Sequence, residues 1–285
     1  MRKVPEKQMN EYLISFVVLS YNQELFIGDA IRSALDQDYQ PVEIIISDDC
    51  SSDKTYEIIT NIISTYKGPN TVKINRNSRT LGISKHLSYV MKRFVSGGLV
   101  FLAAGDDISC SERVSLCVRE WQKRGCPSCL FSNAQIIDEH GVVHGLWLSN
   151  PSPILTLRDF EKTGRAWTLG CTNVVDKNLF SKYGDISSKV IQEDGVIAFR
   201  ALLENGISYI DRPLVMYRRH KENVYDLNDS PKRLKLAARS IYMHSNWFSD
   251  YRKSGIKNVK VLFKIVYRIS GDIFHLYIEL LRSVL

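Results

Sequence analysis

The sequence predicts an α/β protein with a mostly parallel β-sheet flanked by helices, followed by a helical C-terminal extension. Three observations lead to this prediction. Short apolar runs rich in β-branched residues alternate with segments whose apolar residues recur at helical spacing. Polar stretches follow directly after three of those runs. Residues 227–285 carry helical patterns and no strand pattern.

The first half of the chain shows the alternation most clearly. Strands are expected over residues 14–20, 42–49, 71–75 and 99–104, and helices over residues 23–38, 51–66 and 82–94. Ser51 and Asp53 are suited to cap the second of these helices. Helices of this length between strands are typical of βαβ crossovers, which join parallel strands.

The pattern is looser after residue 111. A helix is expected over residues 113–125, a strand over 128–138 with a hairpin continuation over 139–148, and a loop over 150–155. Residues 166–184 combine a short strand with a helix, residues 195–204 form a helix, and two strands flank Pro213. No linker divides these segments from the first half. We therefore assign residues 1–226 to one domain and residues 227–285 to a helical extension.

The end of the extension combines a charged stripe with a broad apolar face. From residue 256 onward, the charged and histidine positions recur every three or four residues, which is the α-helical repeat: Lys257, Lys260, Lys264, Arg268, Asp272, His275, Glu279 and Arg282. So broad an apolar face needs a partner. Three partners stay open: a membrane interface, a second copy of the chain, and the chain's own domain. The basic residues in the first half of the segment favour an anionic membrane surface.

Composition narrows the function classes. Hydrophobic residues make up 44% of the 285 residues, which is enough for a full core, and the net charge is +7. A basic surplus suits nucleic acid, a phosphate-bearing ligand or an anionic membrane. Nucleic acid is disfavoured because the basic residues are scattered or lie in the extension, without a binding motif. We see neither a signal peptide nor an uncharged apolar run long enough to span a bilayer. We therefore expect a cytoplasmic protein, peripheral on the inner face of the membrane.

Six cysteines are present, and without an export signal we expect reduced thiols. Cys126 and Cys129 form a CxxC pair, with Cys110 and Cys117 upstream. A zinc site is the alternative, but this spacing fits no common zinc pattern well. Buried structural thiols are therefore favoured.

Three polar stretches end three of the expected strands. They are "SYN" from Ser20, "DDCSSD" from Asp48, and "GDDIS" from Gly105. Ligands of parallel sheets bind beyond the carboxyl ends of the strands, so these stretches are expected to share one site.

The sequence contains two pairs of adjacent acids, and each pair has both a structural and a functional interpretation. Asp106 and Asp107 form either a solvated turn or a site for Mg²⁺ or Mn²⁺, because adjacent carboxylates ionise together only when a cation or donors compensate them. Glu193 and Asp194 either cap a helix or supply a general base held at a fixed place.

In their order along the chain, these residues resemble the family 2 glycosyltransferases with the GT-A fold. The resemblance covers about residues 13–226 and rests on the segments "VVLSYNQELFIGDAIRSALDQDYQPVEIIISDDCSSDKTYEII", "NSRTLGISKHL", "LAAGDDIS", "QEDGVIAFRALLENG" and "PLVMYRRHKENVY". It implies transfer of a sugar from a nucleoside diphosphate donor, most commonly a UDP-sugar, with inversion by single displacement and with Mn²⁺ or Mg²⁺. Bacterial cell-surface polysaccharide enzymes of this kind imply a glycan or lipid-linked glycan acceptor.

The resemblance also implies roles for individual residues. Asp194 would be the base that deprotonates the acceptor hydroxyl, and Asp107 would bind the metal that bridges the diphosphate. His220 matches a position that in some members approaches the metal or diphosphate, and a surface histidine after a strand is the alternative. Nucleotide contacts would come from the remaining positions: Ser20, Tyr21, Glu24, Asp49, Lys85 and Asp106.

Two departures from the family pattern matter. The metal motif is often D-x-D, whereas Ala104 and Gly105 stand where its first acid is expected. The glycine segment often continues to Arg-Asn, whereas this chain has Leu87 and Ser88, with Lys85 as a substitute for the diphosphate contact. The form with two adjacent aspartates also occurs in the family, so metal dependence remains the expectation.

Two other function classes are alternatives to a glycosyltransferase. A nucleotidyltransferase would need a glycine- and lysine-rich loop for a triphosphate near the N-terminus, and "LSYNQE" contains none. A non-catalytic nucleotide-sugar binding module would be expected to lack a catalytic acid, yet Asp49, Asp106, Asp107 and Asp194 are all present. Neither the sugar nor the acceptor follows from the sequence.

Overall fold

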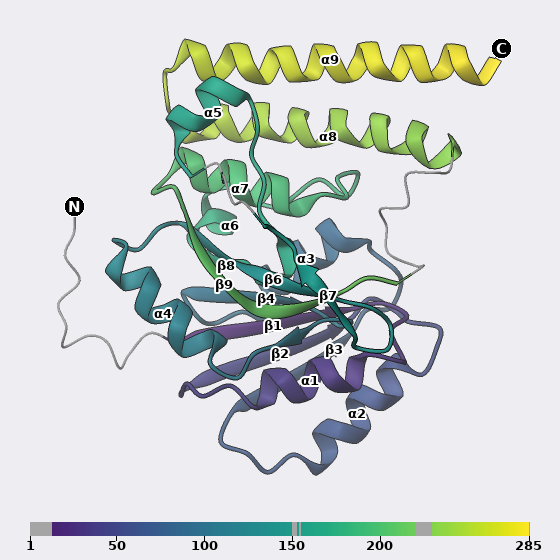
Figure 1. Cartoon of the computed structure of the whole chain (residues 1–285), viewed down its shortest axis with the longest axis vertical. Coiled ribbons are helices and arrows are strands. Elements are labelled where there is room, and N and C mark those ends of the chain that lie inside the picture. Colours follow the sequence, from purple (N-terminus) through teal and green to yellow (C-terminus); the bar gives the residue numbers. More distant parts are fainter. Residues whose placement is uncertain (1–12, 150–152, 154, 221–229, 285) are drawn as a thin grey trace.

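A twisted β-sheet forms the middle layer of the molecule, and helices cover both of its faces (Figure 1). The structure is a computed structural model that describes residues 13–149, 153, 155–220 and 230–284. Neighbouring strands follow the order β3-β2-β1-β4-β8-β6-β9-β5, and β7 pairs with β6. The expected α/β fold with a mostly parallel sheet is confirmed.

The parallel part of the sheet contains β1 (Ile14–Ser20), β2 (Val42–Asp48), β3 (Thr71–Arg76) and β4 (Leu99–Ala104). The helices α1 (Ile27–Leu35), α2 (Thr55–Thr65) and α3 (Ile83–Arg93) connect them, as the alternation predicted. All side chains of β1 and β2 are buried, because helices cover both faces of these strands. The carboxyl ends of β1, β2 and β4 therefore lie at one edge of the sheet.

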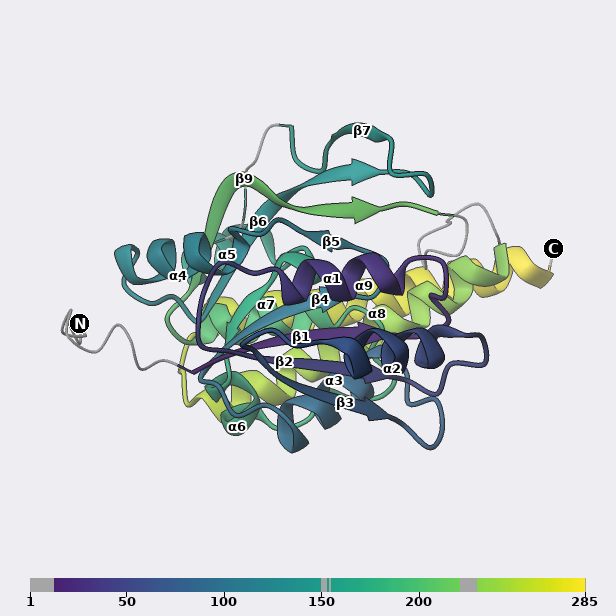
Figure 2. The same ribbon diagram turned by 90° about the horizontal axis from the view of Figure 1, so that it is seen from below.

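The other part of the sheet is mixed and contains β5 (Ile108–Ser109), β6 (Cys129–Ile137), β7 (Val143–Leu146), β8 (Val174–Asp176) and β9 (Ile207–Arg218). Seen from below, β6, β7 and β9 lie together at one edge of the sheet, and β1, β2 and β3 at the other (Figure 2). The prediction of two strands flanking Pro213 was wrong, because β9 runs through it. A shift of register between β6 and β9 at Asn133 accommodates the proline, which has no N–H to donate.

The helices of the sheet's two faces belong to separate hydrophobic clusters. α1, α2 and α4 (Arg113–Lys123) pack on one face, and α3, α6 (Asn178–Tyr183) and α7 (Glu193–Leu203) pack on the other. α5 (Leu157–Thr163), which the sequence analysis did not expect, begins with a capping box between Thr156 and Asp159. The expected helix at 195–204 begins two residues earlier, at Glu193.

The C-terminal helices α8 (Ser230–Ser254) and α9 (Val259–Val284) form two further layers beyond α7 (Figure 1). Trp247 of α8 is buried against Phe199 and Phe160, and its Nε1 donates a hydrogen bond to the Gly195 carbonyl at 3.0 Å. Arg200 of α7 and Asp250 of α8 form a buried ion pair at 2.8 Å. α8 is thus packed into the same core as α7.

Three further predictions concern the chain as a whole. The predicted domain boundary at residue 226 lies outside the described residues. Among the helices that the structure describes, none is both long and apolar enough to cross a membrane. The six cysteines are unpaired thiols, of which Cys117, Cys129 and Cys171 are buried and the other three half-buried. Among the described residues, no group of three or more His, Cys, Asp or Glu side chains is placed to hold a metal ion.

Candidate active site

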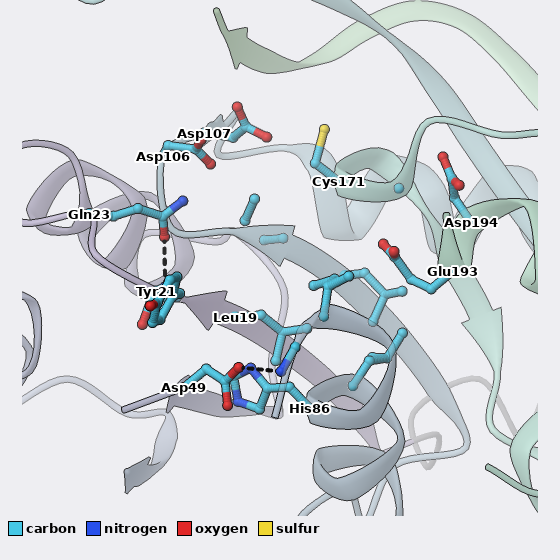
Figure 3. Close-up of a pocket in the computed structure, with 18 of the residues that line it drawn as sticks. Leu19, Tyr21, Gln23, Asp49, His86, Asp106, Asp107, Cys171, Glu193 and Asp194 are labelled. Carbon is cyan, nitrogen blue, oxygen red and sulfur yellow. Dashed lines mark hydrogen bonds between the residues drawn. The ribbon is translucent and has the colours of Figure 1, made fainter. Parts of the chain in front are cut away.

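A cavity of about 660 Å³ lies at the carboxyl ends of β1, β2 and β4. The start of α7 and the end of β9 complete its walls, so segments far apart in the sequence meet there. Seven of the predicted site residues line it: Ser20, Tyr21, Asp49, Asp106, Asp107, Asp194 and His220. Figure 3 shows the two acid pairs on opposite sides of this cavity, with Cys171 between them.

Two loops tied together by hydrogen bonds form the wall beside Tyr21. The backbone N–H of Asn22 donates to Ser51 Oγ at 2.9 Å, and that of Gln23 donates to Thr55 Oγ1 at 2.7 Å. Asn22 has a φ of 51°, in the left-handed region that asparagine tolerates. Tyr21 keeps 49% of its surface exposed at the edge of the cavity, where a flat ring is available for a nucleobase.

Asp49 organises the loop before α3. Its carboxylate accepts hydrogen bonds from Asn77 Nδ2 at 2.7 Å and from the backbone N–H groups of Leu81 and Gly82 at 2.9 and 2.8 Å. Gly82 has a φ of 79°, which a side chain would disfavour. Asp49 therefore holds the loop that lines this part of the cavity, in addition to facing the cavity itself.

His86 is a site residue that the sequence analysis did not identify. It is 2% exposed on α3, and its Nε2 lies 2.7 Å from Ser47 Oγ. Burial lowers the pKa of His86, while the charges of Asp49 and Asp48 act in the opposite direction. The side chain is consequently neutral at pH 7 and can exchange hydrogen bonds with a ligand without adding charge.

The aspartate pair after β4 is held by the end of β9. The backbone N–H of Arg218 donates to Asp107 Oδ1 at 2.8 Å, and its Nε donates to the Asp106 carbonyl at 2.9 Å. Nε2 of His220 lies 3.0 Å from Asp106 Oδ2. The first acid of a D-x-D motif would be crowded at Gly105, because an added Cβ would lie 2.9 Å from Ser20 Cβ.

Asp107 is 4% exposed, and its second oxygen, Oδ2, has no N–H or O–H donor among the described residues. Burial and the neighbouring charge of Asp106 raise the pKa of Asp107 well above its usual value, against the lowering effect of the Arg218 N–H and the Cys171 thiol. A buried carboxylate oxygen without a donor fits a divalent cation. Mg²⁺ and Mn²⁺ are commonly held by one or two carboxylates together with substrate phosphates, so a complete protein cage is not required.

Glu193 and Asp194 open α7 on the opposite side of the cavity. The Gly195 N–H donates to Asp194 Oδ1 at 2.8 Å, which fixes that carboxylate at the helix start. Burial raises the pKa of Asp194 to about 6. Burial and the charge of Asp194 raise the pKa of Glu193 to about 8. At neutral pH Asp194 is therefore ionised and able to accept a proton, whereas Glu193 holds its own.

Two predicted nucleotide contacts do not reach the cavity. Glu24 accepts a hydrogen bond from the Lys54 N–H at 2.9 Å and thereby supports the start of α2. Lys85 lies on the exposed side of α3, because its neighbours Ser84 and His86 face the core. Of the two residues expected at the start of α2, Asp53 accepts a hydrogen bond there, from the Thr55 N–H to its Oδ1 at 2.9 Å, whereas the Ser51 hydroxyl donates to Asp48.

Comparison with known sequences identifies the family. The model of the family Glycosyl transferase family 2 matches residues 15–182, which is more than half of the chain. The chain belongs to this family. It is a glycosyltransferase, as the resemblance implied. The match includes Tyr21, Asp49 and the Asp106–Asp107 pair and ends before Asp194.

Known relatives of this glycosyltransferase support the same conclusion. The chain is 26% identical over 204 residues to the UDP-Glc:alpha-D-GlcNAc-diphosphoundecaprenol beta-1,3-glucosyltransferase WfgD of Escherichia coli, covering 71% of this chain and 75% of WfgD. Its fold matches that of S. aureus TarS in complex with UDP-GlcNAc, with a TM-score of 0.59 and 17% identity over 92% of this chain and 81% of the other. It also matches the mannosyltransferase PcManGT of Pyrobaculum calidifontis in complex with GDP-Man and Mn²⁺, with a TM-score of 0.60 and 15% identity over 93% and 72%. These structural likenesses confirm the GT-A fold.

Proposed function

We propose that this glycosyltransferase moves a sugar from a UDP-sugar to a hydroxyl of a lipid-linked or polysaccharide acceptor, with inversion at the anomeric carbon. The main observation in support is that two pairs of adjacent acids line one cavity in different surroundings, and that burial raises the pKa of Asp107 and of Asp194. WfgD, by its name, acts on a lipid diphosphate acceptor, and TarS binds UDP-GlcNAc. Both favour a UDP-sugar donor, and the name of WfgD also favours a lipid-linked acceptor.

The nucleotide is proposed to bind beside Tyr21 and Asp49. The tyrosine ring offers a stacking surface, and the loop that Asp49 holds offers polar groups to the base and ribose. His86 forms the base of this wall as a neutral group. The donor diphosphate then points toward Asp106 and Asp107.

A divalent cation would be held by Asp107, with Asp106 and His220 beside it. Its contribution would be to neutralise the charge of the diphosphate leaving group. Arg218 holds the other oxygen, Oδ1, through its backbone N–H, which leaves Oδ2 without an N–H or O–H donor among the described residues.

Asp194 is proposed to be the general base. It takes the proton of the acceptor hydroxyl while that oxygen bonds to the anomeric carbon, and the bond from this carbon to the diphosphate oxygen breaks. The nucleoside diphosphate leaves with the electron pair, and single displacement inverts the anomeric centre. A pKa of about 6 suits this role, because the carboxylate is ionised at pH 7 and still basic enough to accept a proton.

A donor screen tests the proposal. The protein is mixed with one of four nucleotide sugars, in the presence of Mn²⁺ or of a chelator: UDP-glucose, UDP-N-acetylglucosamine, UDP-galactose or GDP-mannose. Thermal stabilisation and release of the nucleoside diphosphate are measured. At least one UDP-sugar should stabilise the protein, and more so with Mn²⁺. A nucleoside triphosphate serves as the comparison for nucleotidyl transfer. If no nucleotide sugar binds under either condition, the proposal fails.

A further inference from the structure

The outward side of α9 is apolar over most of its length. α9 is the outermost layer of the molecule (Figure 1), and its described side chains reach Ile278. Phe263 and Phe274 are 65% and 66% exposed. The exposed apolar residues, which we call the outer face of α9, are Val259, Phe263, Val266, Tyr267, Ile273, Phe274 and Tyr277.

These residues form one continuous strip. Successive helix positions turn by about 100°, so positions three, four, seven or eleven apart share a side of the helix. The rings of Phe263 and Tyr267 stack at 6.4 Å between centroids within this strip. The inward side of the same helix carries Val261 and Ile265, both fully buried. The core therefore uses one side of α9 and leaves the outer face exposed.

The middle part of the charged stripe predicted for this segment faces α5 and α8. Arg268 Nε donates to the Gly164 carbonyl at 2.7 Å, and Lys264 Nζ donates to the Lys162 carbonyl at 3.1 Å. Asp272 forms an ion pair with His244 of α8. An amphipathic helix normally turns its charges to solvent and its apolar face to the core. Here much of the charge is engaged by the protein, while bulky apolar side chains remain outside.

Basic residues border the outer face along one side. Lys260 is exposed on α9 itself, and Lys162 and Arg165 are exposed at the end of α5, which the Lys264 and Arg268 hydrogen bonds hold against α9. The nearby acids are engaged elsewhere: Glu161 accepts from Asn258, and Asp272 pairs with His244. None of the residues in the outer face is an acid.

We propose that the outer face of α9 and its basic border dock this protein on the surface of an anionic lipid bilayer. The aromatic and aliphatic side chains enter the boundary between headgroups and acyl chains, and the lysines and Arg165 meet the anionic headgroups. A contiguous apolar patch of this kind on a folded protein marks an interaction surface. This inference goes beyond the proposed function and depends on neither the donor nor the reaction.

Charge favours a lipid surface over a second copy of the chain. An isologous pair that met through the outer faces would contain two copies of the basic border and no acid from either outer face to pair with them. An anionic bilayer instead complements the border, in agreement with the net charge of +7.

The position of α9 is compatible with access to the active site. α7 and α8 lie between α9 and the sheet, and the cavity opens at the carboxyl ends of the strands rather than under α9 (Figure 1). A bilayer that contacts the outer face therefore leaves the cavity uncovered. The C-terminal end of α9 points to the same side of the molecule as those strand ends.

Vesicle binding of the full-length protein tests the proposal. Flotation is measured with phosphatidylcholine vesicles and with vesicles containing about 30% phosphatidylglycerol, at low salt and at roughly 0.5 M salt. The double variant Phe263→Glu/Phe274→Glu should bind the anionic vesicles at least about tenfold more weakly, because two exposed rings become charged. The control Val142→Glu changes a residue that is 56% exposed in the β6–β7 hairpin and should bind like the unchanged protein.

A second variant separates the contribution of charge. Lys162→Gln/Lys260→Gln should weaken binding to anionic vesicles by roughly fivefold for each charge removed and should reduce its salt dependence. Melting temperatures close to that of the unchanged protein show that the exposed substitutions leave the fold intact. Absence of binding to anionic vesicles overturns the proposal. So does a dimer that the Phe263→Glu/Phe274→Glu variant dissociates without any vesicle binding, which would assign the outer face to a second copy.

Discussion

Two pairs of adjacent acids line the same cavity, but their surroundings differ. Asp106 and Asp107 follow a strand and are contacted by Arg218 and His220 from the end of β9. Glu193 and Asp194 begin a helix, and the hydrogen bond that holds Asp194 comes from a backbone N–H. The first pair lies beside the Arg218 guanidinium and the His220 imidazole, and one buried oxygen of Asp107 is left without an N–H or O–H donor among the described residues.

The difference supports a separate proposed role for each pair. Burial raises the pKa of Asp107, of Glu193 and of Asp194. At Asp107, a divalent cation can relieve that unfavourable burial. At the start of α7, a proton relieves it, and this is the condition for a general base. The following predictions test this division, in order of decreasing expected effect.

Asp194→Asn should have the largest effect on turnover. The amide cannot accept the proton of the acceptor hydroxyl, so kcat should fall by roughly 10² to 10⁴. Donor affinity should stay close to that of the unchanged enzyme, since Asp194 faces the acceptor in the proposed arrangement. Steady-state rates and donor titrations measure the two quantities. The matched control is Asp185→Asn, which alters an exposed acid before α7. Full activity of the Asp194→Asn variant would contradict the proposal that Asp194 is the general base.

Asp107→Asn should instead affect donor binding that depends on Mn²⁺. Loss of a carboxylate that contacts the metal should weaken this binding by about tenfold to a hundredfold, a range typical even for residues one shell further out. Calorimetric titration of UDP with Mn²⁺ and with a chelator separates the metal-dependent part. The Asp194→Asn variant is the natural comparison and should behave like the unchanged enzyme. Equal losses in both variants would contradict the division of roles.

The pH profile of kcat/KM should report Asp194. Only the ionised carboxylate accepts a proton, and burial raises its pKa to about 6. Activity should therefore be present above pH 6 and fall about tenfold for each pH unit below it. The residual activity of Asp194→Asn should lack this acidic limb. A limb that persists in the variant would belong to a different group.

The sequence predicted that the polar residues after β1, β2 and β4 lie around one cavity, and they do so for a physical reason. Parallel strands bring their carboxyl ends to one edge, so the polar residues after β1, β2 and β4 had to lie close together. The contacts of Arg218 and His220 with the aspartate pair were harder to predict, because they join residues more than a hundred positions apart. His86 carried no distinctive signal in the sequence, since a lone buried histidine on α3 is equally typical of a core position.

In the C-terminal extension, the sequence predicted the helix but not its orientation. Periodicity predicted a helix with a charged stripe and a broad apolar face, and α9 is such a helix. It could not indicate which side would face the core. That depended on the carbonyls of Thr163 and Gly164 and on His244, which engage Arg268 and Asp272. The capping box of α5 was a signal in the sequence that the analysis did not use.

The smallest expected effect is on stability, and it concerns Glu193. Its pKa rises from 4.5 to about 8 in the folded protein, so the folded state holds this proton more tightly than the unfolded chain does. The resulting destabilisation is absent below pH 4.5, grows as the pH rises and is complete above about pH 8. Glu193→Gln removes the ionisable group and should therefore stabilise the protein at pH 9 but not at pH 4.

The difference should be about 2 kcal/mol at pH 9, which is less than the full shift implies, because the carboxyl group is in partial contact with the cavity. Thermal unfolding at the two pH values measures it, with a rise of roughly 4 °C or more expected at pH 9. Asp185→Asn again serves as the control and should leave the melting temperature unchanged at both pH values. If Glu193→Gln instead lowers stability at pH 9, ionised Glu193 makes favourable contacts, and the two acid pairs are more alike than their surroundings indicate.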